Sequence, residues 1–201
     1  MSTKEKILEK SLELFNNQGV HSVGVRDIAR SLEISPGNMS YHFPKKEDVI
    51  LALMEKMSEG NNFCFEAYGQ TEPSLLSFIA LYEGLFTNQF AYRGLLIGNT
   101  EFEEVLRKRY AYKKTYEKRV NLLNNILIGL RNKGLLHLSE SDQDMFLSFL
   151  AFFGRSWIHE SFIYQRNFTP AETIQHYINL LKWQLSLIAT EEGKLQLAPM
   201  V

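Results

Sequence analysis

The chain has 201 residues and an almost balanced charge, because 22 lysines and arginines face 23 aspartates and glutamates. A hydrophobic content of 45% and a charged content of 22% are ordinary for a folded protein and exclude global disorder. With a single cysteine, Cys64, the chain cannot be a disulfide scaffold, and one thiol fits a reducing compartment. The net charge of −1 also argues against a uniformly basic surface for nucleic acid.

The N-terminus is charged every few residues and has no apolar run of signal-peptide length. The longest apolar region, residues 145–153, is much shorter than the roughly 18–20 apolar residues that a membrane span needs. We therefore expect a cytoplasmic protein without a membrane partner.

Apolar residues recur at three- and four-residue spacing along almost the whole chain, which predicts an all-α fold of about nine helices. Segment 61–71 is ambiguous and could prolong the fourth helix, whereas the tail after residue 192 looks frayed. The expected helices cover, in chain order, about residues 4–15, 25–32, 36–41, 46–60, 73–86, 91–98, 101–132, 141–164 and 170–190.

Several helix ends have residues typical of caps. Pro36 stands where a helix begins, and Thr169 with Glu172 forms a capping box around Pro170. Gly134 is placed to end the long central helix. These signals fix the ends of the elements more firmly than periodicity alone.

Three short helices precede the long helical body, and the second and third are separated by a break at residues 33–35. This pattern indicates a helix-turn-helix unit. The third helix is short enough to enter a major groove, where polar residues at its start can reach the edges of bases.

Residues 19–47 read GVHSVGVRDIARSLEISPGNMSYHFPKKE. In this segment, together with Leu14-Phe15 before it, the chain resembles the N-terminal DNA-binding head of TetR/AcrR-type transcriptional repressors. The rest of the chain resembles that family only in length and helical plan. The resemblance implies a helix-turn-helix DNA-binding domain over 1–48 (motif about 24–43), an effector-binding and dimerisation domain over 49–192, and a tail over 193–201.

The resemblance also implies which side chains meet DNA. Asn38 can pair with adenine through two hydrogen bonds, and Gly37 lets the backbone approach the duplex closely. Lys46 and the rings at the end of the third helix would hold phosphates. A solvated polar Asn38 and packing roles for the rings remain open alternatives. The full set is Arg26, Ser35, Pro36, Gly37, Asn38, Ser40, Tyr41, His42 and Lys46.

Three positions depart from the family pattern. Gly24 stands where many relatives have a hydroxyl that caps the second helix and meets a phosphate. Glu33 replaces the glycine of the turn, which costs some strain and adds a negative charge, and Ser40 replaces the usual tyrosine. The departures bear on affinity and operator sequence rather than on the docking mode.

The charge of the head is neutral, yet it is unevenly distributed. Residues 1–48 hold seven basic and seven acidic residues, but no acid stands between Ile34 and Lys46. We therefore expect weak nonspecific affinity for DNA and a modest salt dependence per subunit.

The body holds most of the aromatic residues, and many rings stand at helical spacing. A plain aromatic core explains each ring singly, but the set could line one apolar pocket. In the resembled family the effector binds in this domain, so we expect a small apolar or aromatic effector. The candidate residues are Phe78, Tyr82, Phe86, Phe102, Tyr110, Phe149, Phe153 and Trp157.

The last two helices are apolar on more than one face, more than one internal contact needs. In the resembled family the equivalent pair forms a four-helix dimer interface. A two-fold dimer would place two recognition helices on a (pseudo)palindromic operator. The candidate interface residues are Phe146, Leu150, Ile178, Leu181 and Leu185.

Other functions find little support. The basic stretch at 107–119 is interleaved with tyrosines, as in single-strand binding platforms, but its spacing favours a solvated helix face. His159-Glu160 lacks the second histidine of a zinc-protease motif, and no cofactor, metal site or catalytic set is evident.

The sequence thus predicts a homodimeric, ligand-responsive transcriptional regulator, a repressor released by its effector, and not an enzyme. The alternatives are a helical small-molecule-binding protein without DNA binding and, further off, a helical-bundle enzyme.

Overall fold

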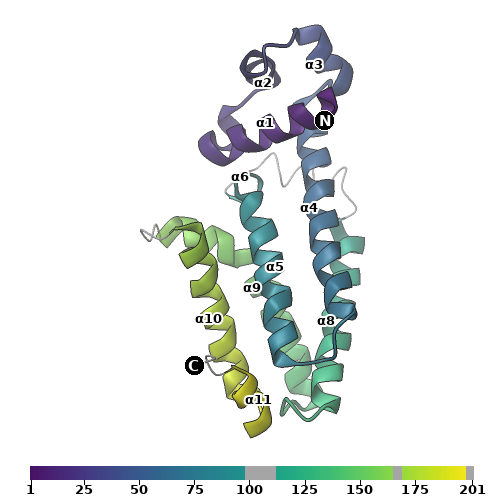
Figure 1. Cartoon of the computed structure of the whole chain (residues 1–201), viewed down its shortest axis with the longest axis vertical. Helices are drawn as coiled ribbons and strands as arrows, with labels where there is room; N and C mark the ends of the chain where they lie inside the picture. Colours follow the sequence, from purple (N-terminus) through teal and green to yellow (C-terminus); the bar gives the residue numbers. More distant parts are fainter. Residues whose placement is uncertain (98–111, 165–168, 198–201) are drawn as a thin grey trace. The chain divides into compact units, whose positions relative to one another are not determined.

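A computed structural model of the protein describes residues 1–97, 112–164 and 169–197. Within these ranges the chain forms ten α-helices and no strand, which confirms the all-α prediction (Figure 1). The chain divides into two compact units, of which unit 1 comprises Met1–Gly60 and Asn88–Tyr112 and unit 2 comprises Asn61–Thr87 and Lys113–Val201. None of the described helices is both long and apolar enough to span a membrane.

Unit 1 contains the short N-terminal helices and the parts of two longer helices that pack with them. Its elements are α1 (Thr3–Gln18), the 3-10 turn η1 (Val20–Ser22), α2 (Val25–Ser31), α3 (Pro36–His42), the first part of α4 (Lys46–Gly69), the end of α5 (Leu75–Ala91) and α6 (Arg93–Leu96). The ambiguous segment 61–71 is therefore helical as far as Gly69, and the boundary expected at residue 48 falls inside α4.

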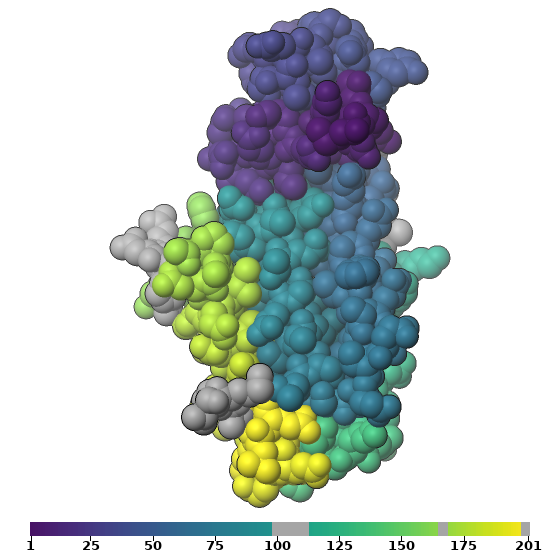
Figure 2. All heavy atoms as spheres, in the orientation of Figure 1, coloured from purple at the N-terminus to yellow at the C-terminus, as the bar shows by residue number. Residues whose placement is uncertain are grey.

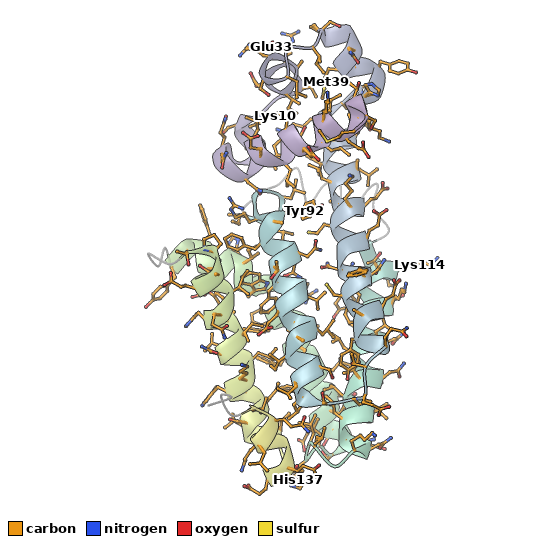
Figure 3. All side chains as sticks on the ribbon, viewed as in Figure 1. Lys10, Glu33, Met39, Tyr92, Lys114 and His137 are labelled. Carbon is orange, nitrogen blue, oxygen red and sulfur yellow. The ribbon has the colours of Figure 1, made fainter. Side chains whose placement is uncertain are left out.

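One apolar core holds the short helices of unit 1 together. It combines Ile7 and Phe15 from α1 with Ile28 from α2 and Phe43 after α3, all at most 3% exposed. Met39 is the buried residue of α3, and Figure 3 shows it directed from α3 toward α1. Because one residue of α3 is buried in the core, the other side chains of the helix are exposed, apart from the half-buried His42.

Helix α6 is fastened to α1 by a single amide side chain. Asn16 Nδ2 donates to the Ala91 carbonyl, and the Gly94 N–H donates to Asn16 Oδ1, both at 2.8 Å. A Cβ atom on Gly94 would lie 2.3 Å from the Phe15 carbonyl oxygen, so glycine is required there. Leu95 of α6 is fully buried in the core of the short helices, which therefore includes residues far apart in the sequence.

Unit 2 is built from four further helices together with the end of α4 and the start of α5. Its elements are the end of α4, the first part of α5, α8 (Tyr112–Asn132), α9 (Glu140–Tyr164), α10 (Pro170–Ile188) and α11 (Glu191–Leu197). The predicted caps are present, because Thr169 and Glu172 form the capping box of α10 and Gly134 takes a positive φ of 71° after α8. Ser139 Oγ accepts the Asp142 N–H at the start of α9.

The prediction of a frayed tail is wrong for residues 193–197, which belong to α11. Gly193 is buried, and a Cβ atom on it would lie 2.3 Å from the Leu135 carbonyl oxygen. Gln196 Oε1 accepts the Leu75 N–H at 2.8 Å, and Thr190 Oγ1 donates to the Gly134 carbonyl at 2.8 Å. Hydrogen bonds to two distant segments therefore order this end of the chain.

Candidate functional site

The N-terminus of α3 is shaped by local sequence. The Asn38 N–H donates to Ser35 Oγ at 3.1 Å, and the Met39 N–H donates to the Ser35 carbonyl at 3.0 Å. Pro36 occupies the first helical turn, where its fixed φ suits a helix and its missing N–H leaves no bond unmade. Ser35 and Pro36 therefore start the helix, which leaves the Gly37 and Asn38 side of the first turn facing outward.

The structure gathers the candidate DNA-binding residues on α2, α3 and the start of α4, all within unit 1. Tyr41 is 84% exposed, and its ring meets the edge of the His42 ring at a centroid distance of 5.1 Å. His42 and Lys46 are half-buried. The other candidates are all exposed, namely Arg26, Ser35, Pro36, Gly37, Asn38 and Ser40.

Acidic side chains near this surface are engaged in capping. Asp27 Oδ2 accepts the Gly24 N–H at 3.0 Å, and Asp27 Oδ1 lies 3.3 Å from the Arg30 guanidinium. Asp48 Oδ2 accepts the Lys45 N–H at 2.9 Å. Two of the head's acids are thus held at helix N-termini, which lessens their repulsion of a phosphate.

Glu33 lies in the turn between α2 and α3, as Figure 3 shows, with a φ of 55°. The left-handed region costs a residue with a Cβ about 1–2 kcal/mol. Glu33 is exposed and its neighbour Ile34 bonds back to the Ala29 carbonyl at 3.1 Å, so the turn keeps its form without glycine.

Rings from three helices of unit 2 pack into one cluster, which we call the ring cluster. Trp157 of α9 stacks on Phe86 of α5 at a centroid distance of 4.4 Å and meets Tyr177 of α10 at 5.3 Å. Phe86 also contacts Phe153 at 5.8 Å. Among the described residues, the cluster's phenylalanines, tyrosines and tryptophan are Phe78, Tyr82, Phe86, Phe146, Phe149, Phe153, Trp157 and Tyr177.

Six of the eight candidate pocket residues belong to the ring cluster, whereas Phe102 and Tyr110 lie outside the described residues. The cluster also takes in Phe146 and Tyr177, which the sequence did not assign to it. Phe146 could have been found, because it stands three residues before Phe149 on the same stripe of α9. Burial of Tyr82 raises the pKa of its phenol, so the hydroxyl stays neutral in the cluster.

The predicted dimer-interface residues are buried within the protomer. Phe146, Leu150, Ile178, Leu181 and Leu185 are all at most 8% exposed within a single protomer. Because these side chains pack in the protomer core, a second copy would contact them less than it contacts the exposed apolar side chains of the same helices.

The exposed apolar side chains of α9 and α10 lie on other faces of these helices. Trp183 and Leu187 on α10 are 58% and 62% exposed, and Leu180 stands one turn before Trp183. Figure 2 shows α10 at the surface along its length, in lime green. We name the following set the apolar surface: Met145, Phe152, Phe162, Ile163, Leu180, Trp183 and Leu187.

The described part of the basic stretch, from residue 112, has the character of a solvated helix face. Lys113 and Lys114 are exposed, and Lys113 lies 3.9 Å from Glu117. The Arg155 guanidinium covers the Tyr116 ring at 5.0 Å. No group of three potential metal ligands occurs among the described residues.

Comparison with known proteins adds independent evidence. Residues 7–53 match the model of the family described as bacterial regulatory proteins, tetR family. The probable HTH-type transcriptional regulator YttP of Bacillus subtilis is 28% identical over 127 residues, which cover 58% of this chain and 61% of YttP. The match thus spans less than two thirds of that relative.

Solved structures show the same fold over nearly the whole chain. A TetR-family transcriptional regulator from Marinobacter aquaeolei has a TM-score of 0.85 at 24% identity, covering 98% of this chain and 96% of that one. The complex of SmeT with triclosan has a TM-score of 0.71 at 14% identity, covering 95% and 93%. The Marinobacter protein and YttP are both described as transcriptional regulators. Residues 7–53 of the chain therefore match the tetR family model, and the chain as a whole shares the helical fold of these solved regulators.

Proposed function

We propose that the protein binds a (pseudo)palindromic DNA operator as a homodimer and represses transcription in the cytoplasm until a small apolar or aromatic effector releases it. The observation that carries the proposal is the one-sided packing of α3. Met39 anchors the helix, while Gly37, Asn38 and Tyr41 stay exposed beside the caps of α3 and α4. This is the arrangement of a helix that presents its N-terminal residues to a major groove.

The exposed residues divide into two kinds of contact. Asn38 is suited to reading adenine through its carboxamide, which both donates and accepts. Lys46, at the first residue of α4, and Arg26, in the first turn of α2, are suited to phosphates. Specificity then rests on Asn38 and affinity on the cations.

The operator can be identified by selecting bound fragments from genomic DNA with the purified protein. Asn38→Ala should then lower the affinity for the selected operator by about 1–3 kcal/mol and relax preference at one base pair per half-site. Lys46→Ala should weaken binding to operator and random DNA alike. Equal losses on both DNAs for both variants would contradict this division, and recovery of no enriched fragment would refute operator binding.

The apolar surface supports the dimer. Large apolar side chains on two neighbouring helices of the chain are rarely left in water, and a second copy can cover them by two-fold symmetry. The symmetry would place two copies of α3 one helical turn of DNA, ~34–36 Å, or a multiple of it apart.

The ring cluster supports an apolar or aromatic effector. SmeT, whose fold this chain shares, has been solved in complex with triclosan. That ligand is known here only for SmeT. Aromatic walls bind such ligands through dispersion and burial of apolar area. An effector that weakens operator binding must itself be bound more weakly in the presence of operator DNA, because the coupling is reciprocal.

A further inference from the structure

One phenol of the ring cluster has a buried hydroxyl without a hydrogen-bond partner in the described part of the chain. Tyr177 is 3% exposed, and its hydroxyl has no hydrogen-bond partner among the residues that the structure describes. Its ring contacts Trp157 at 5.3 Å and Phe153 at 6.3 Å. A buried hydroxyl without a partner is destabilising and rare in folded proteins, so the group calls for an explanation.

Packing alone does not explain a tyrosine at this position. A phenylalanine would fill the same volume between the rings and would bury no polar atom. The buried Ser11 Oγ, by contrast, donates to the Ile7 carbonyl at 2.6 Å. The Tyr68 hydroxyl is also buried without a partner among the described residues, but Tyr68 as a whole is only half-buried and lies outside the ring cluster. Gln143 Oε1 also has no partner, but the Gln143 amide donates to Asn124 at 2.7 Å and its side chain is not part of the ring cluster.

We propose that Tyr177 determines which effectors the protein accepts, by bonding the single polar oxygen of an otherwise apolar, ring-bearing molecule. The inference rests on the proposed effector-responsive function and names the ligand class of that site. The phenol can donate to a carbonyl or ether oxygen and can accept from a hydroxyl. The eight rings of the cluster carry no formal charge, and the His176 ring is half-buried beside Tyr177 at 5.1 Å. An uncharged set of rings favours a neutral effector.

A buried polar group discriminates between ligands more sharply than an apolar wall does. A ligand without the oxygen leaves the hydroxyl unpaired, whereas a ligand with it makes the bond. We therefore expect at least about a tenfold preference for the oxygenated member of a pair that shares one ring skeleton.

The pair 2-naphthol and naphthalene provides this test on the full-length protein by equilibrium dialysis. Wild type should bind 2-naphthol at least about tenfold more tightly than naphthalene, and Tyr177→Phe should abolish the preference while keeping naphthalene affinity. Tyr68→Phe is the matched control, because the Tyr68 hydroxyl is also buried without a described partner but lies outside the ring cluster, and this variant should retain the preference.

A second measurement needs no ligand. Removing the hydroxyl of Tyr177 removes a buried polar atom, so Tyr177→Phe should raise the Tm of the free protein by about 2–4 °C. A lower or unchanged Tm would show that the hydroxyl is bonded in the free protein and would overturn the inference.

The outcomes separate the two proposals. An unchanged ligand preference in Tyr177→Phe, or no binding of either probe to wild type, overturns the assignment of Tyr177 and its ligand class. The proposed function fails instead if a probe binds and the affinity for operator DNA does not change. That result would leave the role of the Tyr177 hydroxyl in ligand binding intact.

Discussion

Helices α3 and α10 expose side chains of opposite polarity. Helix α3 buries Met39 and leaves short polar groups and one tyrosine in water, whereas α10 buries Ile178, Leu181 and Leu185 and still leaves Trp183 exposed. A polar exposed face suits a hydrated, charged partner such as DNA, and an apolar exposed face suits another protein surface. The contrast supports our proposal that the head binds DNA and that α9 and α10 bind a second copy of the chain.

The largest expected effect comes from the apolar surface. Trp183→Glu places a charge among apolar groups, so the dimer should weaken by about 2 kcal/mol or more, a rise in dimer Kd of at least about 30-fold. Sedimentation equilibrium measures the Kd. Leu195→Glu is the control, because Leu195 is exposed on α11 outside the apolar surface. If both variants dimerise as tightly as wild type, the apolar surface is not the dimer interface.

The packed side of the head gives the next prediction. Asn16→Ala leaves the Gly94 N–H and the Ala91 carbonyl without their partner, which should destabilise the protein by about 1–3 kcal/mol. Denaturant unfolding followed by circular dichroism reports the change. The exposed neighbour Asn17 serves as control, and Asn17→Ala should have little effect. Equal stability of the two variants would show that the Asn16 hydrogen bonds contribute nothing.

A substitution at Gly37 tests whether glycine is needed there for folding or for binding DNA. A Cβ atom there would meet only Ser35 Oγ, at 3.9 Å, so the fold tolerates alanine. Gly37→Ala should stabilise the free protein by about 0.5–1 kcal/mol, because alanine is the better helix former. Operator affinity should nevertheless fall by roughly tenfold if the backbone approaches the bases. Unchanged affinity in an anisotropy titration would remove Gly37 from the interface.

Glu33 offers the smallest effect and a matched pair of variants. Glu33→Gly and Glu33→Ala both remove the charge, but only glycine relieves the positive φ of 55°. We expect Glu33→Gly to be more stable than Glu33→Ala by up to about 1 kcal/mol in denaturant unfolding. Both should bind DNA slightly more tightly than wild type at low salt. The reverse order of stability would mean that the turn is unstrained.

The starts of helices could be predicted closely because their signals are local. Ser35 and Pro36 start α3, and Thr169 with Glu172 starts α10, through contacts within four residues of each cap. Such interactions are readable from sequence because spacing alone fixes the geometry.

The faces of α9 and α10 could not be predicted in this way. Apolar residues surround both helices, so spacing does not tell whether Phe146 or Phe152 points inward; tertiary packing decides it. The order of α11 likewise depends on Gly193 fitting against Leu135, a contact between distant segments. The sequence cannot show that the Tyr177 hydroxyl lacks a partner, because the position of a tyrosine along a helix is the same whether or not its hydroxyl is bonded.

The most direct test of the account is the salt dependence of operator binding for wild type and Lys46→Ala. The account predicts a modest slope of log K against log salt for wild type, a strong preference for operator over random DNA, and a slope reduced by about one for each protomer in the variant. A slope that Lys46→Ala leaves unchanged, together with equal affinity for operator and random DNA, would contradict the claim that the exposed side of α3 and the start of α4 read a specific site.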